Sequence, residues 1–240
     1  MNKFVAALIG LKLWLVLVAA TLLVSNNSVE SQTASFSGYP TPTPAIADKI
    51  TRRTSDPFTG DLSRFEDPER DKNLQPDRVM DILNIREGRS VADIGAGSGW
   101  FTVRAARRVG PSGQVFAVEI NSAFVDLVTK RAQTEGLKNV KAVLGKADDP
   151  TLPANSVDAV LFLKSYHEIA EPVALMKKVK TALRKDGLVG IIDRNGDGAD
   201  HGLDESTLIN EMKLAGFVLK EKHDFVKPDE MDYFLVFKSQ

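Results

Sequence analysis

The sequence predicts an α/β fold, a doubly wound and mostly parallel sheet of seven strands with helices on both faces. After residue 60, short apolar runs alternate with segments whose apolar residues have helical spacing. The first run breaks into a glycine turn and then a helix, and the run at 157–163 is apolar after Asp158, as in a strand buried on both faces. Strand and helix repeated in this way predict parallel strands with a ligand at their carboxyl ends.

Each element has its own signal. The apolar runs expected to be strands are 91–94, 114–120, 140–144, 157–163, 188–192, 217–221 and 233–238. The segments expected to be helices are 77–83, 100–109, 122–135, 172–183 and 205–215. Gly136 and Gly216 are expected to close the helices before them, and the Lys-Asp-Gly at 185–187 is expected to stop the helix at 172–183 and turn the chain.

The chain is expected to have three parts, a signal peptide or membrane anchor at 1–25, a Ser/Thr/Pro-rich linker at 26–60 and the α/β domain at 61–240. Residues 4–24 are almost wholly apolar and follow a positively charged start, which is typical of a secretory signal and is also long enough to span a bilayer. Lys3 and Lys12 lie at the front, and no Lys or Arg occurs from 13 to 47. This asymmetry predicts that the domain is exported (periplasmic or extracellular) or membrane-anchored.

Composition excludes several classes of function. The 31 basic and 32 acidic residues nearly balance, so no nucleic-acid partner is expected. The chain has no cysteine, which excludes disulfides, thiolate metal sites and a cysteine nucleophile. Its three histidines are not closely spaced, so we expect no metal site.

The glycine turn after the first strand predicts a nucleotide-type site. Glycines there let the backbone turn sharply and let a ligand approach closely, and the following helix points its positive end at that ligand. The residues expected to hold the cofactor at this turn are Asp93, Gly95, Ala96, Gly97 and Gly99.

The spacing of the glycines indicates which kind of nucleotide this site would bind. A dinucleotide fingerprint needs glycine at position 100, where this chain has Trp100. Glu119 ends the second strand about 20 residues after the glycines, where an acid would hold the two ribose hydroxyls. The alternative is that Glu119 is a helix-capping or solvated carboxylate.

The order Asp-x-Gly-x-Gly-x-Gly resembles motif I of the class I, Rossmann-like S-adenosylmethionine-dependent methyltransferases. The segments 155–158 (Asn-Ser-Val-Asp) and 183–190 also resemble the group that includes ubiquinone/menaquinone-biosynthesis and arsenite methyltransferases. Exported predicted methyltransferases share the Arg-Phe-x-Asp-Pro-x-Arg-Asp at 64–71. The resemblance implies S-adenosylmethionine as cofactor and a small-molecule methyl acceptor. Without cysteine, thiol-dependent arsenite chemistry is excluded.

One position departs from the family pattern. Where the family commonly has Gly-Asp-Ala after the third strand, with the Asp bonding the adenine amino group, this chain has Lys146, which cannot accept that bond. We expect Ala147 and Asp148 to contact the cofactor instead, with Asp149 as a second candidate. The alternative is that both acids only open the loop before Pro150.

The acceptor side is expected after the fourth strand, at 164–168 (Lys-Ser-Tyr-His-Glu). The resemblance implies catalytic roles there for His167, as a general base, and for Tyr166, which would orient a nucleophile. A base is needed only if the acceptor keeps its proton, and the alternative for His167 is a hydrogen bond within the loop. The polar loop at 193–201 either lines the acceptor pocket or binds nothing, and Arg70 and Asp71 either border the site or form a surface ion pair.

The sequence therefore predicts an S-adenosylmethionine-dependent methyltransferase. The competing hypothesis is a non-catalytic binding module that is exported or anchored at the membrane. Lys146 and the amino-terminal segment favour that alternative, since the cofactor is made in the cytosol, whereas Asp93 and Glu119 favour the enzyme.

Overall fold

The computed structural model describes residues 50–55 and 62–240. The predicted signal peptide or anchor at 1–25 and most of the predicted linker lie outside these residues, so they stay predictions. In the part that the structure describes, no helix is both long and apolar enough to cross a membrane.

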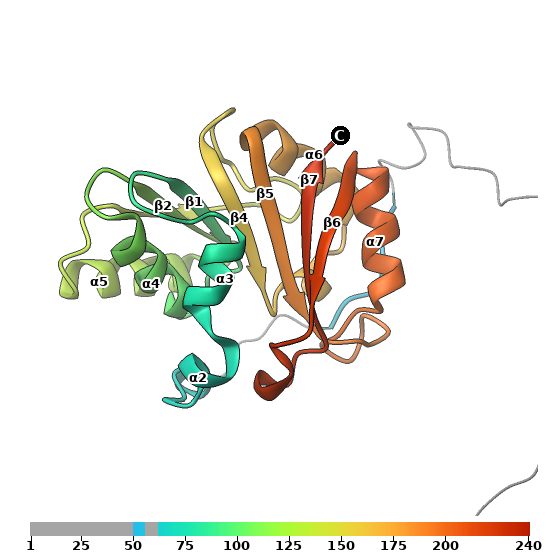
Figure 1. Cartoon of the computed structure of the whole chain (residues 1–240), viewed down its shortest axis with the longest axis horizontal. Helices are drawn as coiled ribbons and strands as arrows, with labels where there is room; N and C mark the ends of the chain where they lie inside the picture. Colours follow the sequence, from blue (N-terminus) through green and yellow to red (C-terminus); the bar gives the residue numbers. More distant parts are fainter. Residues whose placement is uncertain (1–49, 56–61) are drawn as a thin grey trace, which may run out of the picture. The chain divides into compact units, whose positions relative to one another are not determined.

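The described domain is built on a seven-stranded sheet, as predicted (Figure 1). The strands are β1 (Ser90–Ile94), β2 (Gln114–Glu119), β3 (Val140–Leu144), β4 (Val157–Leu163), β5 (Leu183–Asp193), β6 (Phe217–His223) and β7 (Tyr233–Ser239). Their order is β3-β2-β1-β4-β5-β7-β6. All neighbouring pairs are parallel except those of β7, which runs antiparallel to both β5 and β6.

The helices connect these strands, and side chains or prolines start several of them. They are α2 (Arg70–Leu74), α3 (Pro76–Ile82), α4 (Trp100–Val109), α5 (Ser122–Thr134), α6 (Pro172–Ala182) and α7 (Glu205–Leu214). The Asn121 side chain accepts from the N–H of Ala123 and caps α5, and Asp204 caps α7 in the same way. Short 3₁₀ turns lie at Leu62–Phe65, Tyr166–Glu168 and Lys227–Asp229.

Both faces of the sheet are buried, because successive side chains of a strand point to opposite faces. Val91 packs with α3 and α4, whereas Ala92 belongs to the cluster that contains side chains of α6 and α7. In β4, Leu161 and Phe162 divide between the same two clusters. Figure 1 shows helices on both sides of the sheet, which is the doubly wound arrangement.

The predicted turn at 185–187 is an irregularity inside β5. Val157 pairs with Leu183, but Ala159 pairs with Leu188, so β5 carries extra residues at this point. Asp186 has a φ of 64°, the left-handed conformation that a turn or bulge needs. The chain therefore bends where expected, but β5 begins earlier than predicted.

Residues 50–55 fall in the stretch expected to be linker, and they contact the domain. The Arg52 N–H donates to the carbonyl of Ala170, at 3.0 Å. The Arg52 guanidinium donates to the carbonyls of Tyr166 and His167 and forms an ion pair with Glu211 at 3.1 Å.

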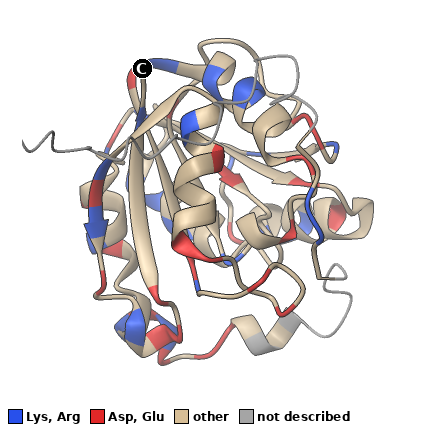
Figure 2. Cartoon of the chain, turned by 90° about the vertical axis from the view of Figure 1, so that its right-hand side faces the viewer, with Lys and Arg blue, Asp and Glu red and all other residues tan. Residues whose placement is uncertain are grey.

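On the side that carries β6 and α7, acidic and basic residues are interspersed (Figure 2).

Candidate functional site

A cavity of about 390 Å³ lies at the carboxyl ends of β1, β2 and β4. Asp93, Glu119 and Leu163 line it from these three strands. After β1 the chain continues to β2 on one side, while β4 pairs with β1 on the other. Such a switch point is where open α/β sheets bind their ligands.

The glycine turn forms one wall of this cavity. Gly95, Ala96 and Gly97 line it, and α4 begins directly after them. Gly99 has a φ of 79° at the start of α4 and does not line the cavity, so its contact with the cofactor stays a prediction. The first turn of α4 therefore directs its positive end toward the cavity, as the sequence predicts.

Glu119 is held at the end of β2 by backbone donors. Its Oε1 accepts from the N–H of Gly97 at 2.6 Å, and its Oε2 accepts from the N–H of Ile120 at 3.2 Å. Burial raises the pKa of Glu119, and these backbone hydrogen bonds oppose that rise. The carboxylate thus lies in the cavity wall beside the glycine turn, where the sequence predicts a ribose-binding acid.

Asp93 is the second carboxylate of the cavity. It is buried, and its Oδ2 accepts from the Thr102 hydroxyl at 2.6 Å. Burial raises the pKa of Asp93 to about 6, the Thr102 hydrogen bond lowers it, and the nearby charge of Glu119 raises it further. Two partly desolvated carboxylates in one cavity favour a ligand with hydroxyl or cationic groups, because such groups restore the lost hydration.

The segment before β1 also contributes to the cavity. The sequence left open whether Arg70 and Asp71 border the site or form a surface ion pair, and the structure gives the two residues different places. Arg70 is buried, lines the cavity and stacks over Trp100 at 4.3 Å. Asp71 instead forms an ion pair with Arg104 at 2.7 Å. Arg70 therefore borders the site, while Asp71 takes the ion-pair alternative.

The loop after β3 does not place Asp148 where the sequence predicts. Lys146 and Ala147 line the cavity, but neither Asp148 nor Asp149 does. Asp148 is exposed, and Asp149 accepts from the N–H of Thr151 at 2.7 Å. The position of Asp148 therefore does not support its role as the replacement for the missing family carboxylate.

This geometry predicts that neither acid matters for the cofactor. We expect Asp148→Asn and Asp149→Asn each to change S-adenosylmethionine affinity by less than about 0.5 kcal/mol, the usual range for surface substitutions. Isothermal titration calorimetry on the two variants measures this. A loss in Asp148→Asn alone would instead restore Asp148 to the adenine site.

Tyr166 is a correction to the sequence analysis. Its side chain is 0% exposed and does not line the cavity. Its ring packs edge-on against Phe162 with centroids 5.5 Å apart, and burial raises the pKa of its hydroxyl well above the ordinary value. The side chain is part of the core because it points away from the cavity, so it does not orient an acceptor.

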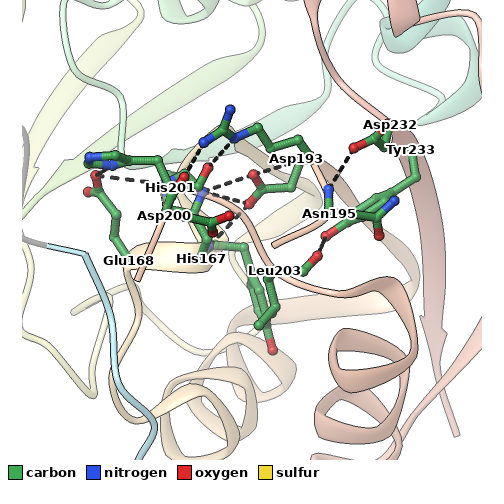
Figure 3. A network of polar contacts seen from close by, with 12 residues as sticks. His167, Glu168, Asp193, Asn195, Asp200, His201, Leu203, Asp232 and Tyr233 are labelled. Atoms are coloured by element: carbon green, nitrogen blue, oxygen red, sulfur yellow. Dashed lines mark hydrogen bonds and ion pairs between the residues drawn. The ribbon is translucent and has the colours of Figure 1, made fainter. Parts of the chain in front are cut away.

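His167 lies behind the cavity wall and is 4% exposed. Its Nδ1 lies 2.8 Å from Oδ1 of Asp193, at the end of β5, and its own N–H donates to the same carboxylate (Figure 3). Nε2 lies 3.8 Å from Oε1 of Glu168, and Glu168 does line the cavity. The base role of His167 stays a prediction, and its neighbour Glu168 lines the cavity whereas His167 does not.

Several cavity residues were not singled out from the sequence. They include Thr54, Phe65, Ser98, Phe124, Ser165 and Glu168. Ser165 and Glu168 belong to the segment 164–168, so their place after β4 was the available signal. Phe65 belongs to the segment 64–71, which resembles exported methyltransferases, whereas Thr54 had no signal because it falls in the predicted linker.

Comparison with known proteins supports this geometry. Residues 91–187 match the family model of a methyltransferase domain. Nocamycin O-methyltransferase of Saccharothrix syringae is 33% identical over 48% of this chain and 41% of its own length. Aklanonic acid methyltransferase of a Streptomyces species is 33% identical over 52% of this chain and 50% of its own length. This chain thus spans about half the length of these curated relatives.

A solved structure extends the likeness to the whole fold. A SAM-dependent methyltransferase from Aquifex aeolicus aligns with a TM-score of 0.67 over 82% of this chain and 98% of its own, at 20% identity. At this identity the likeness establishes the fold. The family match over residues 91–187 covers the glycine turn, β2 and β4, which contribute most of the residues that line the cavity.

Proposed function

We propose that this chain is a class I, S-adenosylmethionine-dependent methyltransferase that transfers a methyl group from S-adenosylmethionine to a small-molecule acceptor, as its match to a methyltransferase domain over residues 91–187 supports. The observation that carries the proposal is the pair of carboxylates Asp93 and Glu119, which line one cavity together with the glycine turn. The alternative of a non-catalytic module rested on Lys146 and the amino-terminal segment, whereas the position of Asp93 and Glu119 at the cavity supports the enzyme.

The walls of the cavity suggest how the cofactor is held. Glu119 would accept hydrogen bonds from the ribose hydroxyls, and Gly95 and Gly97 would allow the ligand to approach the backbone. Asp93 lies at the same end of the sheet, where its charge favours the cationic part of the cofactor. Aromatic side chains line the same cavity, Phe65, Trp100, Phe124 and Phe162 among them.

Methyl transfer is an in-line displacement at the sulfonium carbon. The bond from sulfur to the methyl group breaks as the bond from the acceptor to the methyl group forms, and the sulfur keeps the electron pair. Holding the two reactants in line supplies much of the rate enhancement. A cavity that is lined mostly by apolar surface, with a few polar groups, suits a small organic acceptor.

Removal of the Glu119 carboxylate tests the cofactor assignment. We expect Glu119→Ala to weaken S-adenosylmethionine binding by about 1.5–3 kcal/mol, because hydrogen bonds to a charged group are lost. Calorimetry on the full chain measures this, with Glu87→Ala as control, since Glu87 is exposed and outside the cavity wall.

Titration with NAD in the same experiment distinguishes an S-adenosylmethionine site from a dinucleotide site. We expect no detectable NAD binding, because Trp100 occupies the position of the third glycine of the dinucleotide fingerprint. Tight NAD binding, or an unchanged S-adenosylmethionine affinity in Glu119→Ala, would refute the assignment.

A further inference from the structure

Three side chains of types that can bind a metal ion meet here, although His201 comes from a different loop than His167 and Glu168. One donor atom each of His167, Glu168 and His201 lies within 4.8 Å of the others. His167 and Glu168 belong to the 3₁₀ turn after β4, and His201 lies in the loop after β5 (Figure 3). Two of the three histidines of the chain are therefore in this cluster.

The distances are close to what a metal ion requires. Oε1 of Glu168 lies 3.8 Å from Nε2 of His167 and 3.9 Å from Nδ1 of His201. Donors about 2.0–2.1 Å from a tetrahedral zinc ion are separated by roughly 3.4 Å. The side chains of Glu168 and His201 are 28% and 55% exposed, so both have room to adjust toward these shorter distances.

Asp193 supplies the support that histidine ligands of metals usually have. Its carboxylate lies against Nδ1 of His167, at 2.8 and 3.0 Å. A proton on Nδ1 is stabilised by this carboxylate, which leaves the lone pair of Nε2 directed toward Glu168. A ligating histidine that donates its other ring N–H to a carboxylate is the common second layer of metal sites.

The loop that carries His201 is held by hydrogen bonds of its own. Arg194 donates to the carbonyls of Asp200 and His201, the latter at 2.9 Å. The N–H of Leu203 donates to the carbonyl of Arg194 at 2.8 Å, which closes the loop at its base. The imidazole of His201 is thus presented from a fixed backbone, with its ring 5.9 Å from that of His167.

We propose that Nε2 of His167, Glu168 and Nδ1 of His201 bind one divalent transition-metal ion. Imidazole nitrogens favour ions such as Zn²⁺ over Mg²⁺ or Ca²⁺, and two histidines with one glutamate are a known catalytic zinc set. Three protein ligands leave a coordination position for water or another oxygen. Glu168 also lines the cavity, so one of the proposed ligands belongs to the cavity wall.

The consequence for catalysis rests on the proposed function. A hydroxyl of the acceptor that coordinates the ion would have its pKa lowered, as metal-bound water has. It would release its proton to water, and its oxygen would then form the bond to the methyl group as the sulfonium sulfur takes the electron pair. The cluster therefore favours acceptors with an alcohol or phenol group.

Binding of Zn²⁺ to the full chain without a polyhistidine tag tests the site directly. After treatment with a chelator, calorimetry should give one bound ion, and Co²⁺ in its place should show the absorption of a site with nitrogen ligands. His201→Ala and Glu168→Gln should each weaken binding by more than about 100-fold, since loss of a ligand exceeds the 10–100-fold effect of losing its supporting partner. His223→Ala is the control, because His223 lies on β6, outside the cluster.

The outcomes separate the metal site from the methyltransferase assignment. Absence of one-to-one binding, or equal affinities in His201→Ala and the wild type, would overturn the site. His201 is exposed, so its loss should leave the fold intact, and circular dichroism checks this. S-adenosylmethionine affinity measured without metal reports on the proposed function alone, because Asp93 and Glu119 are not part of the cluster.

Discussion

Replacing Gly95 by alanine should destabilise the domain by about 2–5 kcal/mol and abolish cofactor binding. Gly95 has a φ of 75°, and a left-handed conformation costs other residues about 1–2 kcal/mol. An added Cβ would lie 2.4 Å from Cβ of Ser165, which is far too close. The Ser165 hydroxyl donates to the carbonyl of Ile94 at 2.7 Å, so that side chain is not free to move, and overpacking adds about 1–3 kcal/mol.

Gly97→Ala is the matched control, because alanine there would also have a positive φ but would not meet a neighbouring side chain. Gly97 has a φ of 56°, and an added Cβ would meet nothing within 4 Å. We expect a loss of only about 1–2 kcal/mol in the free energy of unfolding. Urea denaturation of both variants measures the difference. Equal destabilisation of the two variants would show that the contact with Ser165 does not add to the cost of an alanine at position 95.

Asp93→Asn should stabilise the domain at neutral pH while it weakens cofactor binding. The pKa of Asp93 is raised from 3.8 to about 6, mainly by burial. Each pKa unit corresponds to about 1.4 kcal/mol, so the ionised carboxylate lowers the free energy of unfolding by about 3 kcal/mol above pH 6. Asparagine removes this charge and still accepts the hydrogen bond from Thr102, while the cofactor loses an interaction with a charged group.

The sign of the pH dependence is a separate check on Asp93. Between pH 3.8 and 6 the folded state binds more protons at this residue than the unfolded chain does. The contribution of Asp93 to stability is therefore fully present below pH 3.8 and is lost as the pH rises through 6. The advantage of Asp93→Asn should accordingly be largest at pH 7.5 and vanish near pH 4.

Thermal unfolding across this pH range measures the effect, with Asp148→Asn as control because Asp148 is exposed. The control should stay within about 0.5 kcal/mol of the wild type. If the stability difference between Asp93→Asn and the wild type does not vary with pH, the pKa of Asp93 is not raised in the folded state.

Local patterns in the sequence were sufficient for the cofactor half of the site. β1, the glycine turn and α4 are consecutive, so their spacing alone predicts that Asp93, Gly95 and Gly97 lie at one wall. Glu119 joins them because neighbouring parallel strands end at the same edge of a sheet. Gly99 has a positive φ at the start of α4, and an added Cβ there would meet Val128 and Arg131 of α5.

Hydrophobic periodicity and glycine spacing act over a few residues, so the sequence was enough to predict the fold class, the bounds of most elements and the position of Asp93 and Glu119 at the ends of their strands. The surroundings of the segments 164–168 and 193–201 came from the tertiary structure. It placed Tyr166 in the core and Asp148 in solvent, and it brought His201 to His167 and Glu168 beside the cavity. The reason is that side-chain direction in loops, and the contact between loops after β4 and β5, depend on strand order rather than on local pattern.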